Sequence, residues 1–289
     1  MCAYPAPADD ALLVKFWGVR GSIPVCGTDH TIFGGHTPCV EIRCGGELFI
    51  IDAGTGITNL GLAIKETAPK QIEILLSHLH LDHVMGLPFF KPALQADKTI
   101  RISCGNLNGE TAEKPLERLF SPPIFPVTLA QLPAKFTYNG FRAGETLTIG
   151  DHSVRTCPLD HPSGATAYRF DHGGRSVCYV SDVEHGENWP PENLIAFVRN
   201  ADLVIYDAMF CENEYSHCRG WGHSTIAAGI ELCRRAGVKQ LAAFHMHPMH
   251  NDTFLLDMEA DLVKVMPGSF IARQGQSLVF APVAVKVPA

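Results

Sequence analysis

The sequence predicts a layered α/β protein in which sheets are covered by helices. Apolar runs with strand character occupy both the beginning and the end of the chain, and segments with helical spacing lie between them. In a protein of this kind, the helices pack on the sheets and bury their apolar faces. With 289 residues, 46% hydrophobic and 18% charged, the chain can bury a large core and has an ordinary globular composition. We therefore expect a single domain over residues 1–289.

The first part of the chain predicts strands, a hairpin and one helix. Leu12–Gly18 has strand character and leads into a loop rich in glycine and proline. Residues 39–43 and 47–52 predict a hairpin around two glycines. Residues 57–66 have helical spacing, and Ile72–Leu76 is a short apolar strand.

The pattern becomes irregular between residues 89 and 150. Several prolines divide this stretch into loops and short elements. We interpret it as an insertion that forms a cap over a site.

Strands and helices alternate in the rest of the chain. We expect strands at residues 153–158, 165–170, 176–180, 203–206, 240–244 and 269–272, and helices at residues 191–199, 224–236 and 253–265.

The most informative motif is Ser-His-Leu-His-Leu-Asp-His at residues 77–83, directly after the apolar strand. His78 and His80 alternate along an extended segment and therefore point to the same side. Asp82 and His83 follow where the chain should turn into a helix, and they can reach a second point in space. Nitrogen and oxygen donors gathered at two adjacent points are what a pair of metal ions requires.

Three further ligand-type residues stand at or just after the ends of predicted strands: His161, Asp182 and His245. Polar residues that follow several strands are how sites in α/β proteins are assembled. Each residue alone can also be read as a strand terminator or a cap. Their occurrence together with the first motif favours a shared site.

The chain resembles the metallo-β-lactamase-fold hydrolases through these residues, which occur in the family's order from about residue 12 to residue 282. It is most similar to the phosphodiesterase branch related to the Z-type tRNA 3′-processing ribonucleases. Residues 203–210 and the segment Gly222-His-Ser-Thr225 carry that closer resemblance. The resemblance implies an αββα sandwich, with two mixed sheets packed face to face and helices outside.

The resemblance also implies a ligand set for two divalent metal ions, expected to be zinc, with manganese or iron as alternatives. One ion would take His78, His80 and His161, the other would take Asp82, His83 and His245, and Asp182 would bridge both.

The expected function is a dinuclear metal-dependent hydrolase, and we interpret it as a phosphodiesterase for a small or cyclic nucleotide-like diester. Hydroxide that bridges the metals would attack phosphorus. Asp82, His223 and Asp207 are the candidate catalytic residues, with His223 donating a proton to the leaving group and Asp207 orienting it. His223 can also be read as a cap before the helix that follows, although Ser224 could cap instead.

Three alternatives stay open. A lactonase or β-lactamase-type hydrolase would use the same site and would not need His223. A ribonuclease is the second, but the net charge of −7 and the lack of a glycine- and lysine-rich arm disfavour bulk nucleic acid and precursor tRNA. A metal-binding or redox module is the third, and His80, where diiron redox relatives carry a carboxylate, argues for hydrolysis.

The remaining expectations concern partners and location. We expect a small-molecule substrate, no membrane contact, a homodimer by analogy only, and a cytoplasmic protein with reduced cysteines. Residues 1–10 lack the features of a signal peptide. A third, structural metal on Cys26, His30 and Cys39 is a weaker hypothesis. The roles of four histidines stay undecided: His36, His185, His247 and His250.

Overall fold

The computed structural model describes residues 10–283, and seven of its strands form the first of two sheets. These strands are β1 (Leu12–Gly18), β2 (Cys39–Cys44), β3 (Glu47–Ile51), β4 (Gln71–Leu76), β5 (Thr99–Cys104), β6 (Lys135–Gly140) and β14 (Ser277–Phe280). Their spatial order is β14-β1-β2-β3-β4-β5-β6. Pairing is antiparallel from β14 to β3 and parallel from β3 to β6, so this sheet is mixed.

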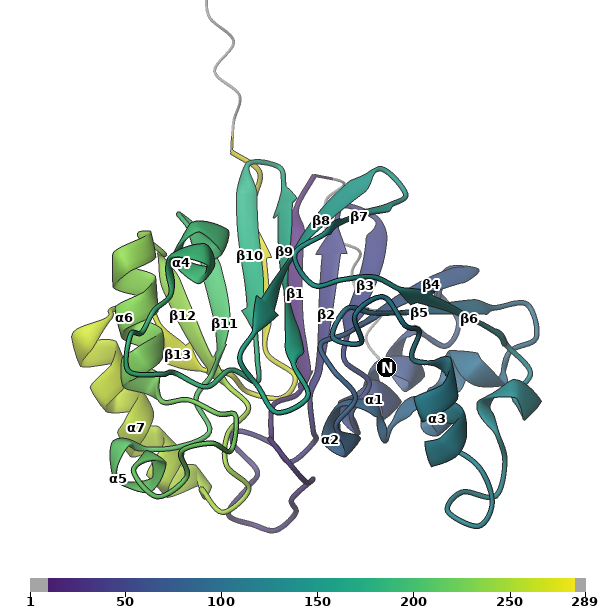
Figure 1. Cartoon of the computed structure of the whole chain (residues 1–289), viewed down its shortest axis with the longest axis horizontal. Helices are drawn as coiled ribbons and strands as arrows, with labels where there is room; N and C mark the ends of the chain where they lie inside the picture. The colour runs from purple at the N-terminus through teal and green to yellow at the C-terminus, as the bar shows by residue number, and fades with distance from the viewer. Residues whose placement is uncertain (1–9, 284–289) are drawn as a thin grey trace, which may run out of the picture.

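The second sheet also has seven strands and is mixed in the same way. It consists of β7 (Thr146–Ile149), β8 (His152–Leu159), β9 (Ala165–His172), β10 (Arg175–Val180), β11 (Leu203–Asp207), β12 (Gln240–Phe244) and β13 (Phe270–Ile271). Their order is β13-β12-β11-β10-β9-β8-β7, antiparallel from β7 to β10 and parallel from β10 to β13. Figure 1 shows the two sheets side by side, with helices on the outer face of each.

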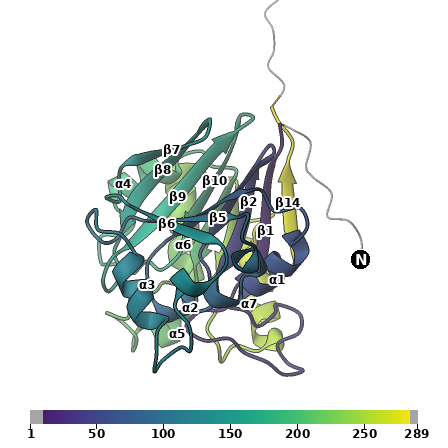
Figure 2. The same ribbon diagram turned by 90° about the vertical axis from the view of Figure 1, so that its right-hand side faces the viewer.

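The helices form the outer layers. They are α1 (Gly56–Ile64), α2 (Leu81–Val84), α3 (Glu113–Leu119), α4 (Glu192–Val198), α5 (Glu212–Tyr215), α6 (Ile226–Ala236) and α7 (Asp252–Val265), with short 3₁₀ turns η1 (Leu87–Phe89), η2 (Lys91–Leu94) and η3 (Leu129–Gln131). Apolar side chains of α1 and α3 pack on the first sheet, and those of α4, α6 and α7 pack on the second. Figure 2 shows α1 and α3 on the side of the molecule where β5 and β6 lie. The predicted αββα sandwich is therefore confirmed.

The core between the sheets follows from the two-residue alternation of strands. Val40, Ile42 and Cys44 of β2 face inward, and Tyr168 and Phe170 of β9 face them from the other sheet. All five side chains are at most 3% exposed. Burial of this shared apolar layer is the main force that holds the sheets together.

Residues 89–150 are more regular than their prolines suggested. They contain β5, β6 and β7, which extend the two sheets, and the short helix α3. Ile100, Ile102 and Cys104 alternate along β5 and face the helices that cover the first sheet, but this short pattern stands among loops and was not recognised from sequence. The interpretation of the segment as an insertion that caps a site stays a prediction.

Two further observations concern the cysteines and the possibility of a membrane-spanning helix. The nine cysteines among residues 10–283 are free thiols, and Cys2 lies outside the described part of the chain. Within the same residues, every helix is too short or too polar to cross a bilayer. The expectation about a signal peptide concerns residues 1–10, of which 1–9 lie outside the described residues.

Candidate metal centre

The seven predicted ligands gather at the ends of β4, β8, β10 and β12, at one end of the sandwich. Three residues that follow strands there, Asp52, Asp182 and His245, have left-handed backbone angles, with φ of 61°, 64° and 61°. Side chains other than glycine adopt this conformation rarely, at an expense of about 1–3 kcal/mol each. The surrounding packing therefore holds these three loops in shapes that aim their side chains into one place.

The first group consists of His78, His80 and His161, whose ligand atoms all lie within 4.8 Å of one another. His161 Nε2 lies 3.0 Å from His80 Nδ1. The other ring nitrogen of His161, Nδ1, lies 2.7 Å from the carbonyl oxygen of Gly222. A carbonyl can only accept, so Nδ1 of His161 carries the proton and Nε2 presents its lone pair to the group.

The second group consists of Asp82, His83 and His245, again with ligand atoms within 4.8 Å. His245 Nε2 lies 3.1 Å from Asp82 Oδ2 and 3.2 Å from His83 Nε2. Asp82 and His83 belong to the single-turn helix α2. The His83 ring lies 4.3 Å from the His78 ring, between centroids, so the second group directly adjoins the first.

Asp182 lies between the two groups. Its Oδ1 is 3.8 Å from His78 Nε2 and 3.9 Å from His161 Nε2. The same carboxylate lies 3.4 Å from His245 Nε2 and 3.3 Å from His83 Nε2. The seven residues are thus one continuous cluster with a carboxylate at its centre.

The donor set fits divalent cations. His78 Nε2 is buried and has no hydrogen-bond partner within residues 10–283. Burial, followed by neighbouring imidazoles, holds the pKa of His78 well below its ordinary value, so its nitrogen keeps a free lone pair. Burial opposes ionisation of Asp182, but the imidazoles around it outweigh burial and hold its pKa well below the ordinary value. Burial lowers the pKa of His83, but the carboxylates of Asp182, Asp82 and Asp52 outweigh burial and raise it well above its ordinary value, which shows how strongly this place favours positive charge. Cations between these buried donors would supply that charge.

Asp52, which follows β3, holds the histidine loop in place. Its carboxylate accepts hydrogen bonds from the Ser77 N–H at 2.7 Å and from the Tyr179 hydroxyl at 2.7 Å. It also lies 2.8 Å from Nδ1 of His83. Because an ionised carboxylate only accepts, Nδ1 of His83 is the protonated nitrogen and Nε2 is left for the cluster.

His223 and Asp207 form a pair beside the cluster. His223 Nδ1 lies 2.8 Å from Asp207 Oδ2 and 3.8 Å from Asp182 Oδ1. Burial lowers the pKa of His223, but the carboxylates, with Asp207 foremost, outweigh burial and raise it to about 9. The cap of α6 is Thr225, which accepts a hydrogen bond from Ala228. His223 therefore does not act as the cap and is held by Asp207.

Two residues of the first loop were not recognised as part of the site from sequence. The backbone N–H of Ser22 donates to Asp82 Oδ2 at 2.7 Å. Arg20 is completely buried and donates to carbonyl oxygens of Gly34 and His250 at 2.8 and 2.6 Å. The sequence did contain a signal for this role, because Arg20 stands in a glycine-rich loop. A buried guanidinium needs several hydrogen-bond acceptors, and the backbone carbonyls of such loops can supply them.

The four undecided histidines surround the cluster without entering its two ligand groups. Three of them contact neighbouring side chains: His36 with Thr55, His185 with Ser224, and His250 with Glu214. His185 also stacks on Tyr215 with ring centroids 3.9 Å apart, and His247 lies against Phe210 at 5.8 Å. These contacts fit a supporting position around the site.

Fold and site define the class of protein: a metal-dependent hydrolase of the metallo-β-lactamase fold. The chain belongs to the beta-lactamase superfamily, whose domain model matches residues 48–246. That span includes every residue of the cluster and the His223–Asp207 pair.

Several known proteins are similar to this chain along most of its length. Ribonuclease Z of Bradyrhizobium sp. (strain ORS 278) is 26% identical, over 89% of this chain and 96% of its own length. Ribonuclease Z of Natronomonas pharaonis is 24% identical, over 87% and 92%. Among solved structures, the metallo-beta-lactamase fold protein YhfI from Bacillus subtilis matches with a TM-score of 0.70 at 19% identity, covering 94% of this chain and 100% of its own. A diphosphatase from the PhnP family matches with a TM-score of 0.68 at 19% identity, covering 94% and 98%.

Proposed function

We propose that the protein is a dinuclear metal-dependent phosphodiesterase for small, nucleotide-like diesters. The observation that carries this proposal is the central position of Asp182, within 3.3–3.9 Å of imidazoles from both groups. In this proposal one ion is held by His78, His80 and His161, the other by Asp82, His83 and His245, and Asp182 is shared. Zinc suits a set of five imidazoles and two carboxylates best, and manganese or iron can use the same set.

Residues around the cluster orient the side chains that would bind the metals. When bound, the two cations supply a water of lowered pKa and stabilise negative charge that develops on phosphorus. Asp52 and the Gly222 carbonyl orient His83 and His161 so that each presents an unprotonated nitrogen. Asp82 accepts the Ser22 N–H, which fixes its carboxylate beside His245.

His223 is the proposed proton donor to the leaving alkoxide. Asp207 accepts from its Nδ1, which leaves the opposite nitrogen to face the substrate. The His223 side chain is 12% exposed, whereas Asp207 is completely buried, so the imidazole reaches solvent and its partner does not. A donor positioned in this way contributes roughly 10²–10⁴ in rate when the leaving group is a poor one.

Exposed apolar side chains beside the site support a substrate with an apolar or aromatic part. Leu81, next to His80, is 51% exposed, and Trp221, two residues before His223, is 63% exposed. Phe210 lies 6.4 Å from Trp221 and 5.9 Å from His223, between ring centroids, so the tryptophan belongs to the surroundings of the pair. An exposed indole beside a phosphodiester site is suited to stacking on a nucleobase.

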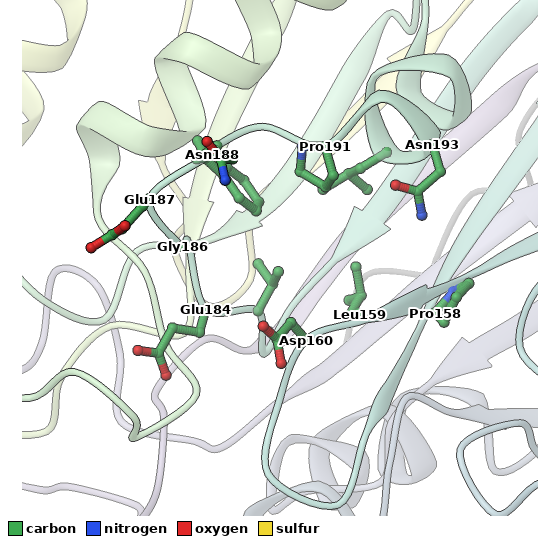
Figure 3. Close-up of a pocket in the computed structure, with 12 residues that line it drawn as sticks. Pro158, Leu159, Asp160, Glu184, Gly186, Glu187, Asn188, Pro191 and Asn193 are labelled. Carbon is green, nitrogen blue, oxygen red and sulfur yellow. The ribbon is translucent and has the colours of Figure 1, made fainter.

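A cavity of about 280 Å³ adjoins the metal cluster, since residues 160 and 183 in its wall precede His161 and follow Asp182. Asp160, Glu184 and Glu187 are among the residues that line this cavity. The Glu184 carboxylate accepts hydrogen bonds from the N–H groups of Gly220 and Gly222, and Glu187 points away from the other lining residues (Figure 3). Negative charge at this place disfavours a long polyanionic chain and favours a compact diester of low charge.

Cleavage of RNA is the second candidate, because Ribonuclease Z relatives match along 87–89% of this chain. An RNA substrate would need contacts to many phosphates, so its cleavage would fall steeply as salt is raised. A small diester makes few such contacts, so its hydrolysis should change little over the same range.

Leaving-group dependence tests the proposal. A nitrophenyl diester releases a stable phenolate, whereas a nucleoside diester releases an alkoxide that needs a proton. We expect His223→Ala to lower kcat about 10²-fold or more for the nucleoside diester and far less for the nitrophenyl diester. The matched control is His217→Ala, an exposed histidine hydrogen-bonded to Ser216, which should leave both rates unchanged.

If His223→Ala lowers kcat equally for both diesters, His223 is not the proton donor. Turnover of a lactone or β-lactam that is insensitive to His223→Ala, without diesterase activity, would reject the proposed substrate class. Cleavage of structured RNA in preference to every small diester, with a steep salt dependence, would favour the second candidate.

A further inference from the structure

A second cluster of metal-ligand side chains lies at the opposite end of the sandwich. It consists of Cys44, His152 and His172, whose ligand atoms all lie within 4.8 Å of one another. Cys44 ends β2 in the first sheet, whereas His152 begins β8 and His172 ends β9 in the second. The first residue of β9 follows the His161 loop, and a strand of eight residues spans roughly 23 Å at about 3.3 Å per residue.

Strand alternation directs the three side chains toward one another. Val40, Ile42 and Cys44 share the inward face of β2. Val154 and Phe170 are inward-facing partners on β8 and β9, so continuing their register by two residues places His152 opposite His172. The two imidazole centroids are 5.6 Å apart. The thiol of one sheet therefore meets two imidazoles of the other at the rim of the shared core.

This arrangement leaves polar groups without the partners they need. His172 Nε2 is buried and has no hydrogen-bond partner within residues 10–283. A buried nitrogen of this kind costs about 1–3 kcal/mol. Cys44 is 3% exposed, so its thiol cannot turn to water either. A bound cation would engage all three side chains at once.

The charges around the cluster also suit a cation. Burial, followed by the carboxylates of Asp171 and Glu47, raises the pKa of the Cys44 thiol to about 12. A cation bound to sulfur reverses that effect, because coordination stabilises the thiolate. Asp171 pairs with Arg155 at 2.7 Å and with Arg169 at 3.0 Å, so its charge is already balanced and it is not needed as a ligand.

We infer that Cys44, His152 and His172 bind one thiophilic divalent cation of the zinc type, separate from the metal centre described above. Thiolate and imidazole ligands are those that zinc prefers. Three protein ligands leave one position open, and a cavity of about 490 Å³ beside both histidines gives access from solvent. Because the ligands come from both sheets, the ion would join the sheets at this end.

The strongest competing cysteine site, predicted from sequence on Cys26, His30 and Cys39, does not form. These three residues are not brought together among the described residues, since Cys26 is exposed and Cys39 is completely buried. The cluster with Cys44 is therefore the one place within residues 10–283 where a cysteine shares a metal-sized group with histidines.

Cobalt substitution tests the inference directly. The metal-free full-length protein is loaded with Co²⁺, and thiolate-to-cobalt charge-transfer absorption is measured in the near ultraviolet. None of the seven residues of the first cluster is a cysteine, so this absorption reports only a cysteine-containing site. We expect the band in the unaltered protein, its loss in Cys44→Ala and a strong reduction in His172→Gln.

The matched control is Cys233→Ala, which removes another buried thiol from a different core cluster and should retain the band. Metal content should fall by about one ion per chain in Cys44→Ala and stay unchanged in Cys233→Ala. Circular dichroism verifies folding, and the half-buried His172 provides the test if Cys44→Ala does not fold.

Absence of the band from a folded, cobalt-loaded protein overturns the inference and leaves the proposed phosphodiesterase site untouched. A band that persists in Cys44→Ala, or one that disappears equally in Cys233→Ala, also overturns it. Loss of diesterase activity with an intact band would count against the first site only, so the two proposals fail separately.

Discussion

Replacement of Asp52 by asparagine should weaken metal binding without removing any proposed ligand. Asp52 is completely buried and its Oδ2 lies 2.8 Å from His83 Nδ1 and 2.7 Å from the Tyr179 hydroxyl. Its Oδ1 accepts the Ser77 N–H at 2.7 Å. Asparagine has the same shape, and its carbonyl can keep the Ser77 bond. The amide NH₂ must then stand where Oδ2 was.

The consequence passes through the tautomer of His83. An NH₂ group donates, so Nδ1 of His83 would have to accept and the ring proton would move to Nε2. Nε2 is the atom that lies 3.3 Å from Asp182 and 3.2 Å from His245, inside the cluster. A protonated nitrogen cannot bind a cation. Changes to the groups that orient ligand histidines typically lower metal affinity 10- to 100-fold, which corresponds to about 1.4–2.7 kcal/mol.

The assay is competition with a chromophoric chelator, measured for each metal equivalent. We expect one equivalent to weaken 10- to 100-fold in Asp52→Asn and the other to change less. Asp202→Asn is the matched control, because Asp202 is a buried carboxylate that accepts from the Ser176 N–H away from the cluster. Unchanged affinity of both equivalents in Asp52→Asn, or an equal loss in Asp202→Asn, would refute the reasoning.

Three further predictions follow from the same structure. Trp221→Ala should raise KM for a nucleoside diester about 5- to 150-fold, the equivalent of about 1–3 kcal/mol of stacking, and leave KM for a glyceryl diester unchanged. Chelation of metal should lower Tm, and added Zn²⁺ at 1,000 times its Kd should restore about 4 kcal/mol measured by urea unfolding. Asp252 has a lowered pKa because N–H groups of residues 31–33 and Arg20 outweigh burial. Its stabilising effect is therefore present above its unfolded pKa of about 3.9 and is lost as pH falls through the lower folded value, so Asp252→Asn should flatten the acid limb of stability.

The sequence predicted those residues of the cluster that lie close together along the chain or directly after an apolar strand. Residues 78–83 carry four of the seven cluster residues within one strand end and one helical turn, so their directions follow from backbone period alone. Asp182 and His245 were found because each stands just after an apolar strand. The left-handed backbone at both positions could not be predicted, because non-glycine residues adopt it only when packing imposes it.

Sequence was silent where a site depends on the register between strands and the packing of sheets. Cys44, His152 and His172 lie far apart along the chain and match no ligand spacing. They meet because β8 pairs with β9 in one register and because β2 faces them across the core. A shift of that register by one residue would turn a histidine to the opposite face of the sheet and separate the three. The same alternation that buries the core therefore decides whether this second cluster exists, and the cobalt measurement tests that structural step as well as the chemistry.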